Sequence, residues 1–321
     1  MTISLSEHFT YGKLLKFTFP SMIMMILTSI YGVVDGVFIS NFIGAEPFAA
    51  VNIVMPFLII FGAVGFMLGT GGSALVAYTL GTGNHKKANE IFSLLIYVLI
   101  GIGLVFTVLG ELFLAPISGI LGADAAMLPY CIQYGRVILI ALVPFMLQNV
   151  FQSLLVTAER PQLGLYITII SGVTNMILDA LFVAVWRLGV PGAAAATALS
   201  QSIGGIVPVI YFLLPNKSRL RLGKTHFDMS SIVKACSNGA SEFMTNISMS
   251  IVNMLYNWQL MRLLGTNGVA AYGVIMYVTF IFAAIFIGYS MGSAPITGYH
   301  YGAGNKEELK SLLRKSLRII I

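Results

Sequence analysis

The sequence predicts an all-α protein that crosses a membrane many times. Hydrophobic residues make up 57% of its 321 residues and charged residues only 9%, and the mean hydropathy is +0.89. Soluble domains carry about 25% charged residues, so a soluble fold is excluded. The apolar stretches are also far longer than the roughly ten-residue alternating segments of a transmembrane β-barrel. The predicted fold class is therefore a polytopic bundle of membrane-spanning helices.

Apolar stretches follow one another along the chain, separated by short polar or glycine-containing connections. Each complete stretch is long enough to cross about 30 Å of hydrocarbon as a helix. The predicted spans are 14–43, 47–80, 89–114, 127–156, 162–186, 191–214, 231–264 and 267–300. A ninth begins near residue 307 and is cut off at Ile321. We therefore expect about 8–9 transmembrane helices in a C-terminally truncated chain.

Loop charges give the orientation of these spans. Lys and Arg are concentrated in the N-terminal segment and in the second, fourth, sixth and eighth connections. Cytoplasmic loops of membrane proteins are enriched in these residues, so we expect a multi-pass protein of the cell membrane with its N-terminus in the cytoplasm. The same distribution explains the net charge of +6, and no nucleic-acid partner is expected.

An internal repeat divides the chain. Residues 43–84 match residues 264–305 at a constant offset of 221, and both copies end in Gly-x-Gly-Asn. The two copies are six spans apart, so both start on the same membrane side and are related by an axis along the membrane normal. We expect a six-helix N-terminal lobe (1–214), a basic cytoplasmic linker (215–227), and an incomplete C-terminal lobe (228–321) with helices 7, 8 and the start of 9.

Polar residues inside the first, fifth and sixth spans form the first candidate site. Asp35 and Asp179 are carboxylates within apolar stretches, where such residues are costly and usually serve ion, proton or substrate pathways. Asn175 precedes Asp179 by one helical turn, and Thr197 lies in the next span. Their oxygens suit a hard cation such as Na⁺, and the carboxylates could instead carry protons. For Asn175 or Thr197 alone, a hydrogen bond between helices explains the residue equally well.

The pattern resembles the multidrug and toxic compound extrusion (MATE) transporters. The residues that carry the resemblance are Asp35 followed by Ile43-Gly44, the Asn175-x-x-x-Asp179 motif, Thr197 and the repeated Gly-x-Gly-Asn ends. The resemblance covers the whole chain as the first two thirds of a two-lobed, six-plus-six helix protein. It implies that Asp35, Asn175, Asp179 and Thr197 surround a coupling Na⁺ or H⁺. It also implies export of cationic amphiphilic drugs, with no cofactor beyond the coupling ion, and we expect a monomer.

A second polar stripe lies in the seventh span. Its members recur at helical spacing and are Glu242, Asn246, Ser250, Asn253 and Asn257. Such a face is costly against lipid, so it should line a water-filled cavity or pack on other polar helices. Glu242 would attract a cationic drug there, unless it is a solvated residue near the helix end. Gln148, Gln152 and Tyr31 complete the predicted substrate-binding set, although the two glutamines could instead hydrogen-bond a neighbouring helix.

The alternative function is that of a lipid-linked oligosaccharide flippase of the same superfamily. That function calls for a strongly cationic cavity to hold pyrophosphate, whereas the charges within these spans are mainly acidic. An intramembrane enzyme is not expected, because the four histidines lie at loops or span ends and form no catalytic cluster. A channel would require a symmetric polar ring in place of a two-lobed repeat.

Overall fold

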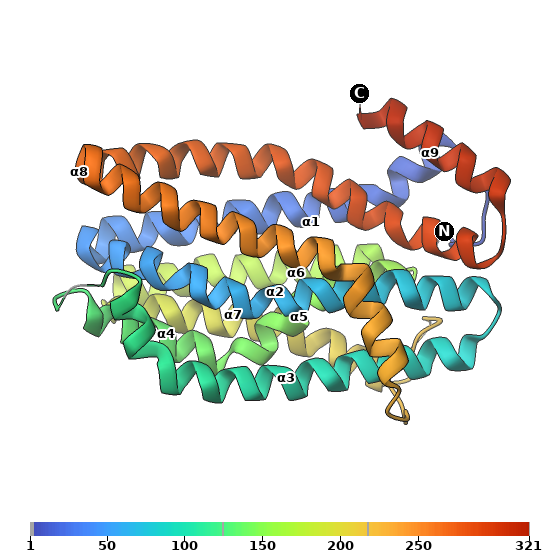
Figure 1. Ribbon diagram of the computed structural model, residues 1–321, viewed down its shortest axis with the longest axis horizontal. Helices are drawn as coiled ribbons and strands as arrows, with labels where there is room; N and C mark the ends of the chain where they lie inside the picture. The colour runs from blue at the N-terminus through green and yellow to red at the C-terminus, as the bar shows by residue number, and fades with distance from the viewer. Residues whose placement is uncertain (1–2, 124, 217, 321) are drawn as a thin grey trace.

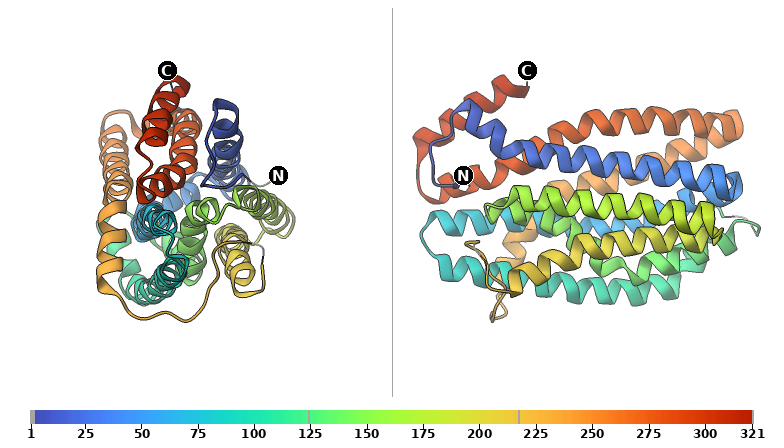
Figure 2. Two further views of the ribbon diagram at one scale, coloured as in Figure 1. Left: turned by 90° about the vertical axis from the view of Figure 1, so that its right-hand side faces the viewer. Right: turned by 180° about the vertical axis from the view of Figure 1, so that it is seen from behind.

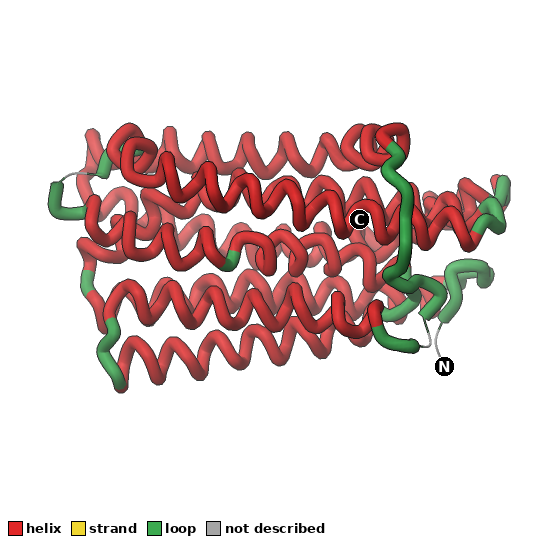
Figure 3. The backbone as a smooth tube through the Cα atoms, turned by 90° about the horizontal axis from the view of Figure 1, so that it is seen from below, coloured by secondary structure: helices red, strands yellow, loops and turns green. Residues whose placement is uncertain are grey.

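The computed structural model describes residues 3–123, 125–216 and 218–320. It does not describe the side chains of residues 45, 257, 261, 265–271, 273, 274 and 277. Within this part of the chain every regular element is helical and no strand occurs. The helices lie side by side in one elongated bundle (Figure 1), and their connections gather mainly at its two ends (Figure 3).

The first seven α-helices form the N-terminal part of the bundle. They are α1 (Tyr11–Phe38), α2 (Ala45–Gly81), α3 (His85–Ile120), α4 (Leu128–Ile140), α5 (Leu142–Thr157), α6 (Pro161–Asp179) and α7 (Gly189–Leu213). Two short π-helical segments extend α1 and α6, namely η1 (Ile39–Ile43) and η2 (Ala180–Val185). Side-chain caps fix several helix starts: Thr10 and Asn84 accept the Lys13 and Lys87 amides.

The six spans predicted for this lobe are present in the structure. Five are single stretches long and apolar enough to cross a membrane: Tyr11–Ile43, Glu46–Gly81, His85–Ile120, Pro161–Val185 and Gly189–Leu213. The predicted fourth span, 127–156, is formed by α4 and α5, which meet at a 58° bend. With Val278–Gly302 from the second part of the chain, the described residues contain six such spans, or seven if the bent pair counts as one.

The C-terminal part consists of α8 (Met229–Gly302) and α9 (Lys306–Ile320). α8 is helical throughout, yet it doubles back on itself as a hairpin (Figure 1). In a straight helix Tyr256 and Tyr272 would lie about 24 Å apart. Their rings stack at 5.2 Å, and the Tyr272 hydroxyl donates to Asn253 Oδ1 at 3.0 Å. The two limbs correspond to the predicted spans 231–264 and 267–300.

One of the two spans predicted within α8 differs from the prediction in its hydropathy. The first limb of α8 is not among the membrane-spanning candidates, because its stripe of Asn and Ser residues lowers its hydropathy. The predicted start of the ninth span is helical: α9 begins at Lys306, runs to Ile320 and is strongly amphipathic.

The repeat has a structural counterpart in the packing of α2 on the second limb of α8. A methyl group on Gly81 would lie 2.1 Å from the Tyr299 carbonyl oxygen, and one on Gly302 would lie 2.1 Å from the Tyr78 carbonyl oxygen. Tyr78 and Tyr299 are repeat partners, and so are Gly81 and Gly302. An exchange of contacts between partners is what a two-fold axis produces.

The same exchange occurs where α1 and α2 meet the rest of α8. Gly71 of α2 packs on the backbone of Gly239 in the first limb, and Gly292 of the second limb packs on Thr18 of α1. Gly71 is the repeat partner of Gly292, and Thr18 and Gly239, which precede the matched segments, are separated by the same offset of 221 residues. The interface between the two parts of the chain is therefore pseudo-symmetric.

The segment between α7 and α8 is a packed strap. It appears as the yellow-to-orange trace along one side of the end-on view in Figure 2. The Arg221 amide donates to Asn89 Oδ1 at 2.7 Å, and the Gly223 amide donates to Ser93 Oγ at 3.0 Å. Leu220, which is part of the strap, is fully buried. The predicted linker thus lies against α3, and Lys217 within it is outside the described residues.

Candidate functional site

Asp35 and Asp179 both lie where an α-helix changes into a π-helix. The Ile39 amide at the start of η1 bonds the carbonyls of Asp35 and Gly36, and Asp179 is the last residue of α6 before η2. The segments η1 and η2 contact each other. π-helical turns are rare and frequently occur at functional sites.

The two carboxylates come from separate helices and converge in the interior of the N-terminal part. Asp179 is fully buried, and neither of its carboxylate oxygens has a hydrogen-bond partner among the described residues. Asp35 is partly exposed, but its Oδ1 is buried and equally unpartnered. The two side chains are close enough for their charges to interact. Burying unpaired carboxylates is costly, so their arrangement requires a reason other than packing.

Thr197 and Asn175 are the other two predicted residues of this site; Thr197 lies beside Asp35, and Asn175 shares a face of α6 with Asp179. The Thr197 hydroxyl of α7 is beside the Asp35 carboxylate, although Thr197 Oγ1 and Asp35 Oδ1 form no hydrogen bond of ordinary geometry. Asn175 is buried one turn before Asp179, and its Nδ2 has no partner in the described chain. That face of α6 packs on α7, since the Ser171 hydroxyl donates to the Ser200 carbonyl at 2.6 Å.

Tyr134 of α4 belongs to the same cluster and was not among the predicted site residues. Its side chain is fully buried, and its hydroxyl lies near Asp35, Asp179 and Thr197 without a hydrogen-bond partner in the part of the chain described. Gln201, one turn after Thr197, also has a buried, unpartnered oxygen. A tyrosine in an apolar span carries no spacing signal, so only the three-dimensional packing identifies it.

The donor set of this cluster consists of carboxylate, amide and hydroxyl groups. Oxygen donors suit a hard monovalent or divalent cation, and paired carboxylates can also hold protons. The described residues contain no group of three or more His, Cys, Asp or Glu side chains that could hold a metal ion. The residues present supply oxygen donors of the kind that hard cations prefer, and the two carboxylates can also be protonated.

The second polar stripe lies on the face of α8 that meets α2. A methyl group on Gly239 would lie 2.0 Å from the Met67 carbonyl oxygen, so this face is directed at α2. Glu242, Asn246 and Asn253 follow Gly239 at helical spacing and share its face. All three are partly exposed, and Asn246 Nδ2 donates to the Glu242 carbonyl at 2.8 Å. The side chain of Asn257 lies outside the described residues.

The other predicted substrate residues line the interior of the N-terminal part. Gln148 packs against Gly204 of α7, and the Tyr31 ring packs against Gly172 of α6. Gln152 is 5% exposed and its Oε1 is unpartnered among the described residues. The contact of these three residues with a substrate stays a prediction.

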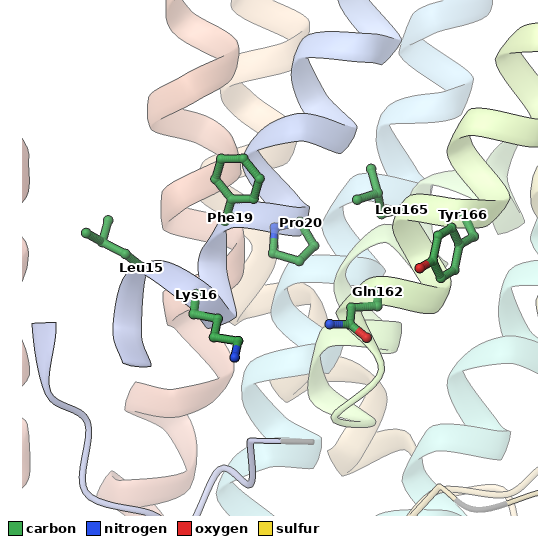
Figure 4. Close-up of a pocket in the computed structure, with 7 residues that line it drawn as sticks. All are labelled: Leu15, Lys16, Phe19, Pro20, Gln162, Leu165 and Tyr166. Atoms are coloured by element: carbon green, nitrogen blue, oxygen red, sulfur yellow. The ribbon is translucent and has the colours of Figure 1, made fainter. Parts of the chain in front are cut away.

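Two surface pockets contain none of the predicted site residues. The first, of about 400 Å³, lies between α1 and α6 and is lined by Leu15, Lys16, Phe19, Pro20, Gln162, Leu165 and Tyr166 (Figure 4). The second, of about 610 Å³, lies at the end of the bundle that holds Ser6, Gly83 and Arg219. The candidate site is therefore described by its buried polar groups.

The match to a family model decides the identity of the fold. The MatE family model matches residues 20–181 and 243–321, which lie on both sides of the strap. The chain belongs to the MatE family. This family consists of transporters, so this MatE chain is a multi-pass membrane transporter and not an enzyme, as the sequence predicted.

This MatE chain is similar in sequence to proteins named as multidrug exporters. It is 26% identical over 312 residues to the multidrug export protein MepA of Staphylococcus haemolyticus (strain JCSC1435), covering 96% of this chain and 68% of that protein. It is 25% identical over 308 residues to MepA of Staphylococcus aureus (strain MRSA252), covering 95% of this chain and 67% of that protein. The chain thus spans about two thirds of the length of these relatives.

Solved MATE structures share the fold. A crystal structure of MATE in complex with MaL6 superposes with a TM-score of 0.90 at 22% identity, covering 97% of this chain and 70% of that chain. The outward-facing conformation of a multidrug resistance MATE family transporter of the MOP superfamily gives 0.89 at 22% identity, with the same coverage. The expected MATE-type architecture is therefore confirmed for the part present here.

Proposed function

We propose that this MatE chain acts in cation-coupled multidrug export. In this proposal Na⁺ or H⁺ enters the N-terminal lobe, and cationic amphiphilic compounds leave the cell in exchange. The observation that carries it is the pair Asp35 and Asp179, two acids from separate helices whose buried oxygens lack partners among the described residues. The naming of the MepA relatives as multidrug export proteins supports the substrate class.

The chemistry of the pair explains how an ion would drive a conformational change. Two buried carboxylates repel each other when both are charged, and a bound cation or proton removes that repulsion. Asp35 and Asp179 adjoin the π-helical segments η1 and η2, so neutralisation acts directly on the ends of α1 and α6. Coupling then requires only that ion and drug stabilise different conformations.

The stripe on α8 is the proposed binding surface for the drug. Glu242 and Asn246 follow Gly239 on the face directed at α2, and Asn253 follows them at helical spacing with its Oδ1 bound by Tyr272 of the second limb. A carboxylate there favours cations over neutral compounds, and the amides can hydrogen-bond polar groups of many shapes. No comparable row of basic side chains occurs on this face among the described residues, so an anionic lipid-linked substrate is disfavoured.

Membrane orientation and oligomeric state are part of the same proposal. Most Lys and Arg residues of the loops lie near the end of the bundle that holds the N-terminus, including Lys13, Lys86 and Arg221. Positive loops favour the cytoplasm, so we place that end in the cytoplasm and the protein in the cell membrane as a monomer. The division into an N-terminal lobe (1–214), a linker (215–227) and a C-terminal lobe (228–321) is proposed on the strap and the pseudo-symmetric interface.

Transport in reconstituted vesicles tests the proposal. Na⁺ and pH gradients are imposed separately, and efflux of a fluorescent cation is followed for the wild type and Asp35→Asn. We expect one gradient to drive efflux and Asp35→Asn to abolish it. Glu46→Gln, a change of an exposed acid in the first turn of α2, is the matched control and should transport normally. Wild-type efflux by Asp35→Asn at equal expression would refute the assigned ion site.

A further inference from the structure

The N-terminal segment Ile3–Thr10 is held at one end by the N-terminal part of the bundle. The Ser4 hydroxyl and the Leu5 amide donate to Glu159 Oε1 at 2.9 and 2.8 Å. Arg219 of the strap donates to Ser4 Oγ at 3.1 Å, and its Nε lies 3.4 Å from Glu159 Oε2. Glu159 follows α5 with a φ of 59°, a left-handed conformation that is uncommon for residues other than glycine. The chain tolerates this backbone conformation at the residue that holds the segment.

The other end of the segment is held by the C-terminal part. The Phe9 amide donates to Glu308 Oε1 at 2.9 Å, and His8 Nδ1 lies 2.5 Å from Glu308 Oε2. Lys315, two helical turns further along α9, donates to the Phe9 carbonyl. The Phe9 side chain is fully buried and meets the ring of His300 in α8 edge-on.

The segment is an integral part of the packing. Leu5 and Phe9 are both fully buried in a hydrophobic cluster that also contains Ile296 of α8 and Leu312 of α9. The carboxylates that hold the two ends are themselves mostly buried, with side chains 13% exposed for Glu159 and 7% exposed for Glu308. Buried carboxylates are costly unless they are hydrogen-bonded, and here each accepts a backbone amide of the segment. A tail that merely rested on the surface would not need these two anchors.

We propose that Ile3–Thr10 is a clasp that holds the two lobes together at the end of the bundle bearing the N-terminus, and that its release is required for the lobes to part there. Beneath it the lobes are in backbone contact at Gly81 and Gly302, so this end is closed. Parting the lobes separates Glu159 from Glu308, and the short segment between them must leave one of its anchors. The inference rests on the proposed transport function, because only alternating access requires this end to open.

Two native cysteines allow a test that does not depend on transport. Cys236 is half-buried and adjoins Ala235, whose carbonyl oxygen packs on Gly71 across the interface between the lobes, so opening should increase its exposure. Cys131 is fully buried within the N-terminal part and donates to the Ala50 carbonyl, so it reports unfolding. The rate of alkylation of each thiol by N-ethylmaleimide is measured by mass spectrometry in lipid vesicles without drug or ion gradient.

The decisive variant is Glu308→Gln, which weakens the anchor on α9. Its matched control is Glu307→Gln, since Glu307 is an exposed acid one residue earlier on the same helix. We expect Glu308→Gln to raise the alkylation rate of Cys236 about tenfold and Glu307→Gln to leave it unchanged. Glu159→Gln, at the other anchor, should raise it by a similar factor. Wild-type rates in both anchor variants would overturn the clasp.

Unfolding and failure of transport give different signatures. A variant in which Cys131 also reacts is unfolded, and His8→Ala then decides the question, because the His8 side chain is 66% exposed and lies outside the core. Faster Cys236 alkylation in His8→Ala supports the clasp, and a wild-type rate overturns it. Loss of the proposed export function would appear as absent drug efflux in the wild type, whatever the alkylation rates are.

Discussion

Replacement of Gly81 by alanine should shift this transporter away from the closed state seen here. The added methyl group would lie 2.1 Å from the Tyr299 carbonyl oxygen, whereas ordinary contact begins at 3.4 Å. The lobes must therefore part by about 1.3 Å at this point, because the obstacle is backbone and cannot rotate away. Overpacking of this kind costs about 1–3 kcal/mol. The population of the closed state relative to an open one should fall by roughly 5–150-fold.

The assay is again the alkylation rate of Cys236, measured in vesicles. Cys236 should react faster in Gly81→Ala than in the wild type. Gly302→Ala should show the same increase as Gly81→Ala, since its methyl group meets the Tyr78 carbonyl at the same distance. Gly101→Ala in α3 is the control, because a methyl group there meets nothing within 4 Å.

The double variant provides the sharpest result. Once the lobes part to relieve one clash, the second is relieved as well, so the combined cost should be clearly less than the sum of the two single costs. Strict additivity would mean that the two glycines act at independent sites. Unchanged Cys236 alkylation in both single variants would refute the view that these glycines set the lobe separation.

Three further outcomes are expected. Asp35→Asn should abolish ion-driven efflux while membrane insertion, measured by expression and protease protection, stays normal. Glu242→Gln should weaken binding of a cationic drug by about 1–2 kcal/mol, roughly 5–30-fold, and leave a neutral compound of similar size unaffected; equal losses would assign Glu242 a structural role. Burial acts to raise the pKa of Glu308, but the hydrogen bonds from the Phe9 amide and His8 outweigh it and hold the pKa below its usual value of 4.5. The contribution of Glu308 to the stability of the clasp is therefore fully present above pH 4.5 and is lost as the pH falls through the lowered pKa. Hydrogen exchange of the 3–10 peptide, corrected for intrinsic rates, should accelerate only in strong acid.

Much of the fold could be predicted from the sequence because membranes impose simple length rules. The six N-terminal spans follow from apolar runs long enough to cross the hydrocarbon. The offset of 221 residues predicted the two-fold relation that the contacts of Gly71 and Gly292 display. The first limb of α8 was harder to classify, because a polar face directed at another helix lowers hydropathy without preventing a helix.

The candidate site could be predicted only in part. Asp35 and Asp179 can be recognised in the sequence because a charged residue in an apolar span is rare. The π-helical turns η1 and η2 beside them have no compositional signal, since their residues are as apolar as those of any helix. Tyr134 joins the cluster through the packing of α4 against α7, which cannot be inferred from residue spacing in the sequence. The roles of these residues stay predictions until transport is measured.

The pseudo-symmetry also shows how the two lobes have diverged. When the offset of 221 is continued toward the N-terminus of each copy, Asp35 corresponds to Tyr256, which stacks on Tyr272, and Glu242 corresponds to the buried Ser21. Each lobe thus keeps an acid where the other has none, while the glycine contacts that join the lobes are retained in both. In the proposed mechanism the ion acts on the N-terminal lobe and the drug on the face of α8, and the shared interface carries the coupling between them. Because coupling between binding sites is reciprocal, any variant that loosens this interface must change the affinity for the ion as well as that for the drug.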